Sequence, residues 1–184
     1  MAHSIAVLVG SLRKESFTRK IARAIEPLAP DLSFTHLEIG ELPLYNQDLD
    51  EKPPEKWVAL REALKKADGY LFATPEYNRS VPGVLKNAID IASRPHGQSA
   101  FGKQKPAAVI SVTPSQVGAF GANHHLRQSL AYLDLAVLGQ PEIYVAQVNK
   151  LLDDQGNLIH EDSKKLFTQF GKAFTAWVAR FAKK

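Results

Sequence analysis

The first residues that could do chemistry follow an apolar run at positions 5–9. They read Gly-Ser-Leu-Arg-Lys-Glu-Ser-Phe-Thr over residues 10–18 and precede a predicted helix. Hydroxyl groups, the Arg13 guanidinium and the free N–H groups of a helix N-terminus are together the donors that bind a phosphate. The alternative is that Ser16 only caps the helix while Arg13 is solvated. This segment by itself supports both interpretations.

Two widespread phosphate-binding patterns are missing from the sequence. It contains no GxGxxG, and no Gly-Lys pair is followed by Ser or Thr after a glycine-rich turn. The first pattern marks dinucleotide-binding Rossmann domains and the second marks nucleotide triphosphatases. The sequence therefore argues against both classes.

A second candidate segment reads Thr-Pro-Glu-Tyr-Asn-Arg-Ser-Val-Pro-Gly over residues 74–83. Pro75 and Pro82 stiffen it, while Tyr77 offers an aromatic face and Asn78 an amide. A loop of this kind can hold a planar heterocycle. The alternative is a turn that leads into a proline-started helix, with Tyr77 half buried.

A third candidate segment, residues 113–121, reads Thr-Pro-Ser-Gln-Val-Gly-Ala-Phe-Gly. It combines hydroxyls with glycines, which allow a ligand to approach the backbone closely. Taken alone, this pattern is weak.

Each of these segments follows a short apolar run, and such runs are typical of strands buried on both faces. The runs lie at residues 5–9, 33–37, 70–74, 107–112 and 142–145. Their spacing leaves room for a crossover helix after each strand, so the pattern predicts a five-stranded parallel sheet with helices on both faces. In a sheet of order 2-1-3-4-5, the three segments meet in one crevice at the carboxyl ends of the strands. We expect a single domain over residues 1–184.

Helices are predicted at about 16–28, 54–67, 82–93, 122–138 and 163–181. Proline in the first turn supports the second and third of them. The last helix carries an apolar stripe that we interpret as a packing face: Leu166, Phe170, Phe174, Trp177 and Phe181.

Composition excludes several functions. The absence of cysteine rules out disulfides, thiolate catalysis and Cys-ligated metal centres, and no metal site is expected at His124 and His125. The net charge is +4, but Lys and Arg are dispersed, so we expect no nucleic-acid partner. No apolar run is long enough to span a bilayer, and we expect a soluble, cytoplasmic protein without a membrane partner. The acidic residues of the segment 41–52 are expected to be solvated: Asp48, Asp50 and Glu51.

Four motifs together resemble the NAD(P)H-dependent FMN reductase family, in particular its quinone and chromate reductase branch. They are Gly-Ser-Leu-Arg-Lys-x-Ser-Phe at 10–17, Leu-Pro-Leu-Tyr at 42–45, the second segment at 74–83, and Leu-Lys-Asn-Ala-Ile-Asp at 85–90. The likeness extends over nearly the whole chain, and residues 74–90 are its most specific part. It implies a flavodoxin-like three-layer sandwich that binds FMN.

The resemblance also implies which residues bind the cofactor. The FMN phosphate would be held by Ser11, Arg13, Ser16, Phe17 and Thr18, although related proteins commonly have Asn at the position of Thr18. The isoalloxazine would lie along Pro75, Glu76, Tyr77, Asn78 and Arg79, and the ribityl and ring side would be closed by Thr113 and Ser115.

The implied activity is hydride transfer from NADPH or NADH through FMN to a quinone in a ping-pong cycle, with chromate or other small oxidants as further candidates. The chemistry would belong to FMN, so no catalytic side chain is expected. The resemblance further implies a homodimer or homotetramer.

An alternative of another class is a flavodoxin-like electron-transfer protein that serves a protein partner. Such carriers are typically strongly acidic, whereas this chain is basic and has Arg13 and Lys14 in its first segment. A receiver-type signalling domain shares the topology but needs acidic residues where this chain has Gly10-Ser11 and Thr74-Pro75. The receiver hypothesis therefore fails on chemistry.

Overall fold

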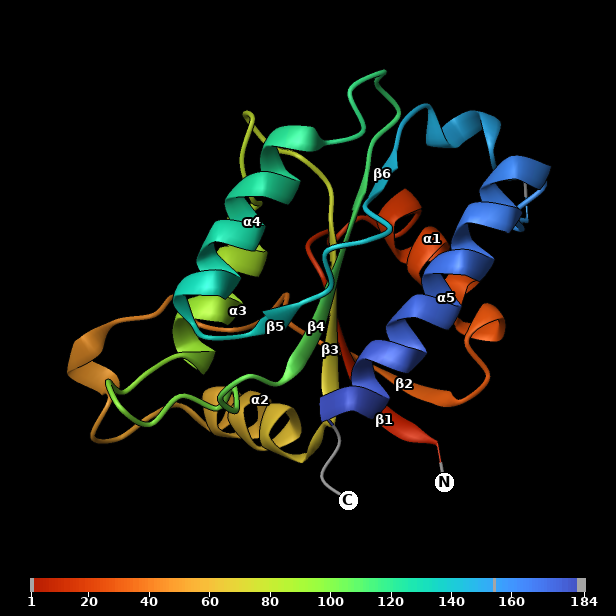
Figure 1. Cartoon of the computed structure of the whole chain (residues 1–184). Helices are drawn as coiled ribbons and strands as arrows, with labels where there is room; N and C mark the ends of the chain where they lie inside the picture. Colours follow the sequence, from red (N-terminus) through yellow and green to blue (C-terminus); the bar gives the residue numbers. More distant parts are fainter. Residues whose placement is uncertain (1, 154, 182–184) are drawn as a thin grey trace.

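A computed structural model of the chain describes residues 2–153 and 155–181, and its centre is one parallel sheet (Figure 1). The strands are β1 His3–Val9, β2 Leu32–Leu37, β3 Gly69–Thr74, β4 Pro106–Val112, β5 Ala136–Val137 and β6 Ile143–Val145. Their order is β2-β1-β3-β4-β5, with β6 also paired to β4. This confirms the predicted flavodoxin-like order, with the last position shared by two short strands.

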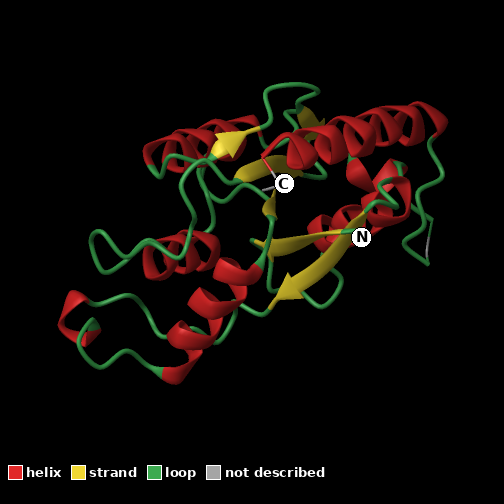
Figure 2. Ribbon diagram, turned by 60° about the horizontal axis from the view of Figure 1, so that its bottom comes forward, coloured by secondary structure: helices red, strands yellow, loops and turns green. Residues whose placement is uncertain are grey.

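Helices cover both faces of the sheet, as Figures 1 and 2 show. They are α1 Phe17–Ile25, α2 Glu55–Lys66, α3 Gly83–Ala92, α4 Phe120–Tyr132 and α5 Glu161–Phe181, with 3₁₀ turns η1 Glu26–Leu28, η2 Gln47–Leu49 and η3 Val148–Lys150. Helices α1 and α5 pack on one face, and α2, α3 and α4 pack on the other.

The inner strands β1, β3 and β4 are buried along most or all of their length because each face of the sheet has its own core. The expectation of burial on both faces is wrong for the edge strand β2, where Ser33 and Thr35 are exposed. In β1, Ile5, Val7 and Val9 are buried in the core under α1 and α5. Ala6 and Leu8 are buried in the core under α2, α3 and α4. Successive side chains of a strand point to opposite faces, so both sets must be apolar.

The prediction of a helix over 122–138 is wrong at its end, because α4 stops at Tyr132. Asp134 has a φ of 58°, a left-handed conformation that ends the helix. The backbone N–H of Leu138 then donates to the carbonyl of Ala107, so this apolar stretch pairs with β4 as the short strand β5. The run predicted at 142–145 forms β6, which pairs with the other half of β4.

The apolar stripe of α5 is also shifted from the prediction. Leu166 is 37% exposed, whereas its neighbour Phe167 is buried beside Phe170, Phe174 and Val178. These four positions recur every three or four residues and form the face on the sheet. The stripe therefore packs as expected, but with Phe167 in place of Leu166.

The segment between β2 and α2 is anchored rather than freely solvated. The backbone N–H of Tyr45 donates to Oδ1 of Asn87 on α3, at 2.8 Å. Asp50 is mostly buried: it accepts a hydrogen bond from the Tyr45 hydroxyl, and its Oδ1 lies 3.6 Å from Nη2 of Arg61. The expectation that Asp50 is solvated is therefore wrong, while Asp48 and Glu51 are exposed.

Candidate functional site

Three loops leave the carboxyl edge of the sheet at neighbouring strands. We call residues 10–16 after β1 the first loop, residues 75–82 after β3 the second loop, and residues 113–119 after β4 the third loop. The second and third loops stand at the upper edge of the sheet in Figure 1. A doubly wound sheet binds its ligands at this edge, where the connections diverge to opposite faces.

The first loop and the start of α1 present hydroxyl groups at a helix N-terminus. Ser11, Ser16 and Thr18 are buried, while Arg13 is exposed. Oγ of Ser16 accepts the N–H of Arg19 at 3.2 Å, so Ser16 caps the helix. That hydroxyl keeps its own hydrogen for a second acceptor, and the first N–H groups of a helix have no intrahelical partner. Capping and anion binding are therefore compatible here.

Phe17 is partly buried and packs against the core under α1 and α5. Only its backbone N–H, in the first turn of α1, remains as a donor toward an anion.

The tip of the second loop is a tight turn with an unusual backbone. Tyr77 and Ser80 exchange two backbone hydrogen bonds of 3.1 and 3.0 Å. Between them, Asn78 and Arg79 have φ values of 49° and 65°, so both central residues are left-handed, as in a type I′ turn. Asn tolerates the left-handed conformation, but it is uncommon for Arg. Backbone strain of this kind persists only where surrounding contacts impose it.

The second loop also touches the first. A Cβ built on Gly10 would lie 3.2 Å from Cδ of Pro75, which is closer than most such contacts. Glycine therefore permits the two loops to meet at the end of β1. Tyr77 is 50% exposed, which agrees with the half-buried side chain of the alternative for this loop.

Thr113 and Ser115 occupy the start of the third loop. The Thr113 hydroxyl lies 3.2 Å from Oγ of Ser115 and 3.2 Å from the N–H of the same residue. The carbonyl of Ser115 accepts the N–H of Gln147, which ties the loop to the end of β6. Because Oγ of Ser115 accepts from Thr113, its own hydrogen is available to a ligand.

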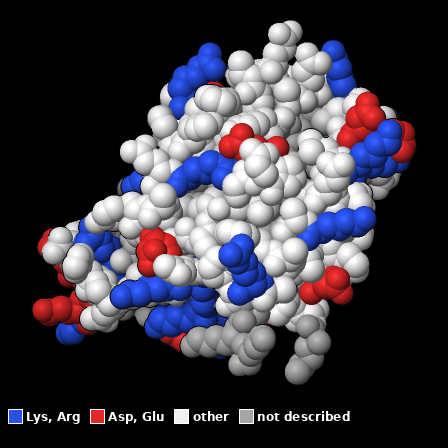
Figure 3. Space-filling model, viewed as in Figure 1, with Lys and Arg blue, Asp and Glu red and all other residues white. Residues whose placement is uncertain are grey.

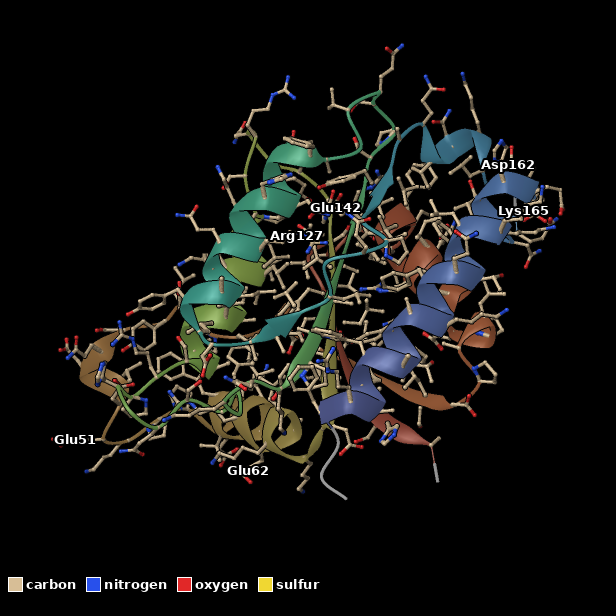
Figure 4. The ribbon with its side chains drawn as sticks, in the orientation of Figure 1. Glu51, Glu62, Arg127, Glu142, Asp162 and Lys165 are labelled. Atoms are coloured by element: carbon tan, nitrogen blue, oxygen red, sulfur yellow. The ribbon has the colours of Figure 1, made fainter. Side chains whose placement is uncertain are left out.

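A buried polar network under the third loop escaped the sequence analysis. Oγ of Ser111 donates to the carbonyl of Gly118 at 2.7 Å and accepts from Nδ2 of Asn123 at 3.1 Å. Oδ1 of Asn123 accepts from Nε of Arg127 at 2.8 Å. Arg127 lies beside Glu142, with Nε 3.8 Å from Oε1 (Figure 4). The network fixes the end of the third loop, and only the Ser111 hydroxyl within an apolar strand could have signalled it.

The structure brings five of the predicted site residues into one hollow of about 410 Å³. Its walls are the second and third loops, and its lining consists of Glu76, Asn78, Arg79, Thr113, Ser115, Gln116 and Val117. The residues predicted to hold a phosphate do not line this hollow, and neither do Pro75 and Tyr77. They lie on the adjoining first loop, the start of α1 and the exposed side of the second loop.

The donor set fits FMN. Hydroxyls, an exposed guanidinium and a helix N-terminus suit a phosphate at the first loop, while the hollow offers hydroxyl and amide groups for a polar ring system. Arg79 is largely exposed at the hollow, where its Nη1 lies 3.4 Å from the Glu76 carboxylate. Elsewhere on the face shown in Figure 3, Lys and Arg are interspersed with Asp and Glu.

The two adjacent histidines of α4 have separate partners. Nε2 of His124 lies 3.0 Å from the Tyr144 hydroxyl, and Nδ1 of His125 lies 3.0 Å from Oγ of Ser80. Among residues 2–153 and 155–181, no group of three His, Cys, Asp or Glu side chains has the geometry of a metal site. Over the same ranges, none of the helices has the length and apolar character needed to cross a bilayer.

Comparison with known proteins identifies the family. The family model described as NADPH-dependent FMN reductase matches residues 3–150. A quinone reductase from Pseudomonas putida is 52% identical over 178 residues, covering 96% of this chain and 95% of the relative. A 2-hydroxy-1,4-benzoquinone reductase from Burkholderia sp is 48% identical over 179 residues, covering 97% of each chain. The structure of FerB, a flavoenzyme NAD(P)H:(acceptor) oxidoreductase from Paracoccus denitrificans, superposes with a TM-score of 0.91 at 39% identity, covering 98% of this chain and 99% of that one.

The chain belongs to the NADPH-dependent FMN reductase family. It is an oxidoreductase with FMN as cofactor and NAD(P)H as electron donor, which confirms the predictions of family, enzyme class and cofactor.

Proposed function

We propose that this protein reduces quinones with NADPH or NADH by a ping-pong reaction at an FMN held where the three loops meet. The observation that carries the proposal is the hollow of about 410 Å³ between the second and third loops, at the edge of the sheet where β3 and β4 end. The names of the quinone reductases from Pseudomonas putida and Burkholderia sp support the choice of acceptor.

In this proposal each loop has one task. The first loop and the start of α1 bind the phosphate with Ser11, Arg13, Ser16, Thr18 and the N–H of Phe17. The second loop lies along the isoalloxazine with Pro75, Glu76, Tyr77, Asn78 and Arg79, and the third closes the ribityl side with Thr113 and Ser115. Bound FMN would supply the redox chemistry, namely hydride acceptance from the nicotinamide and electron delivery to the acceptor.

The side chains of the crevice bind and orient. The left-handed turn at Asn78 and Arg79 lies at the hollow, and both residues are exposed. The Arg79 guanidinium, together with the net charge of +4, attracts anionic reactants toward the same opening. Chromate or another small oxidant would then be reduced at the open crevice without a pocket of its own.

We further propose that residues 1–184 act as one cytoplasmic FMN-binding domain in a homodimer or homotetramer. Support for assembly comes from the exposed face between α3 and α4, where Tyr132 is largely exposed beside a hollow of about 570 Å³. Light scattering on the purified protein measures the subunit number, and a monomeric mass would contradict this part of the proposal.

The test of the function begins with a visible spectrum of the protein mixed with FMN, followed by anaerobic addition of NADPH or NADH and then of benzoquinone. We expect the flavin absorption to bleach with the donor and to return with the quinone. Initial rates at several fixed quinone concentrations should give parallel double-reciprocal lines. Failure to bind FMN, or lines that intersect, would overturn the cofactor site or the ping-pong order respectively.

A further inference from the structure

Helix α4 lacks a capping side chain of its own. The residue before it is Ala119, whose φ of 56° places it in the left-handed region, and no acidic residue lies in the first turn. The first N–H groups of a helix need acceptors from elsewhere, and an Ala in the capping position supplies none. A helix of 13 residues therefore begins without local support next to the third loop.

The missing acceptor comes from the second loop. Oε2 of Glu76 accepts the backbone N–H of Ala122 at 3.0 Å, and Oε1 lies 3.4 Å from Nη1 of Arg79. The Glu76 side chain is only 10% exposed. A carboxylate at this position is stabilised by the partial positive charge of the helix N-terminus as well as by the hydrogen bond.

Gly121 allows the two elements to come this close. A Cβ at that position would lie 2.7 Å from the carbonyl oxygen of Arg79 and 3.0 Å from Oε2 of Glu76. Both distances are at or below the limit for real side chains, so the contact needs a glycine. The hydrogen bond of 3.0 Å between Ser80 and His125 adds a third link one turn further along α4.

These contacts join the two walls of the flavin hollow. The second loop carries Glu76 and the left-handed turn, and the third loop leads directly into α4 through Ala119. Glu76 lines the hollow, yet both of its carboxylate oxygens are engaged by protein groups. A strained turn keeps its shape only when surrounding contacts hold it. Here these are the Glu76–Ala122 hydrogen bond, the close approach of Gly121 to Arg79 and the Ser80–His125 hydrogen bond. We call these three contacts the clamp.

We propose that Glu76 is a positioning residue. By capping α4 from the opposite wall of the crevice, its carboxylate sets the spacing of the second and third loops and so determines how tightly the protein retains FMN. This inference rests on the proposed FMN site and assigns to Glu76 a task other than direct contact with the flavin through its carboxylate.

Two substitutions disturb the clamp in different ways. Glu76→Ala removes the acceptor, whereas Gly121→Ala keeps Glu76 but forces α4 away from the second loop. Glu76→Gln keeps an amide oxygen that can accept the N–H of Ala122. The matched control is Glu62→Ala on α2, since Glu62 also pairs with a cation three residues ahead, Lys65, and lies at the far end of the sheet in Figure 4.

The readouts are the dissociation constant of FMN, from quenching of its fluorescence, and the visible circular dichroism of the bound flavin. Loss of a helix cap predicts about tenfold weaker retention for Glu76→Ala. Gly121→Ala should weaken retention similarly, and the double variant should be little worse than either single one. Glu76→Gln should recover most of the affinity, and Glu62→Ala should match the parent in both readouts.

Three results would overturn the inference. Glu76→Ala could lower the melting temperature while FMN affinity and dichroism stay at the parent values, which would make the cap purely structural. Glu76→Gln could be as weak as Glu76→Ala while Gly121→Ala binds normally, which would indicate a direct charge contact with the ligand. The loss of FMN affinity in the double variant could equal the sum of the two single losses, which would show that Glu76 and Gly121 act independently. A parent chain that binds no FMN would instead refute the proposed function, and hydrogen exchange of residues 76–80 would still test the clamp in the variants.

Discussion

Replacing Asn123 by Ala tests the buried network beneath the third loop. Asn123 is fully buried and links Ser111 on β4 to Arg127 on α4. The substitution removes a neutral hydrogen bond, typically about 1 kcal/mol, and one to a charged group, about 1.5–3 kcal/mol. Arg127 keeps its bond to the Leu138 carbonyl at 2.9 Å, and its side chain is 17% exposed. Because Arg127 is partly solvated, we expect the total loss in free energy of unfolding to lie in the lower part of the summed range, at about 3 kcal/mol.

Thermal unfolding is the direct assay for this loss of stability. For a chain of this size, about 3 kcal/mol corresponds to a fall in melting temperature of roughly 6–12 °C. Gln128→Ala, an exposed position on the same helix, is the control and should change the melting temperature little. Ser111 also holds the Gly118 carbonyl, so retention of FMN should weaken in Asn123→Ala as well. A fall of less than about 2 °C would refute the reasoning, because it would mean that the buried partners find other hydrogen bonds.

Three further predictions concern single side chains. Arg13→Ala should weaken FMN retention about three- to tenfold and leave the KM for NADPH unchanged when FMN is in excess. Equal FMN retention in parent and variant would show that Arg13 is not part of the phosphate site. Burial raises the pKa of Tyr70 to about 12 from 10.0, so the folded state favours the neutral phenol. The neutral phenol therefore contributes its full share to the free energy of unfolding below pH 10. Between pH 10 and 12 that free energy falls by up to about 1.4 kcal/mol per pH unit, and urea titrations over this range should find a shallower fall in Tyr70→Phe. Asp50→Ala should cost about 3 kcal/mol because it leaves the buried Arg61 without its carboxylate, whereas Asp48→Ala should stay within about 0.5 kcal/mol in the same denaturation assay.

The cap provided by Glu76 separates the roles of the polar groups in the second loop. From its residue types, the loop offers a carboxylate, a phenol, an amide and a guanidinium to a ligand. In the structure the Glu76 carboxylate faces α4, while Tyr77, Asn78 and Arg79 are exposed. The charged groups of such a loop thus divide between those that hold its shape and those that reach solvent or ligand.

The sequence by itself determined the architecture and the edge of the sheet at which the three candidate loops lie. Apolar runs such as residues 70–74 identify strands because a strand between two helical layers must be apolar on both faces. Proline at position 82 marks the start of α3 through its own backbone geometry. Parallel topology then places the loops after β1, β3 and β4 at one edge, since the strands all end there. These features depend on the residue itself and its near neighbours in the chain.

Only the tertiary structure decided the partners of the polar groups. The stretch 133–138 is apolar enough to continue a helix, but pairing with β4 draws part of it into the sheet. Asp50 looks solvated in its own segment until Arg61, on α2, approaches it. Glu76 and Ala122 are 46 positions apart, and their hydrogen bond exists because the folds of two separate loops meet. A local sequence pattern indicates burial and backbone preference. A buried polar group costs free energy unless it is hydrogen-bonded, and its partner comes from a distant segment that only the tertiary structure brings beside it.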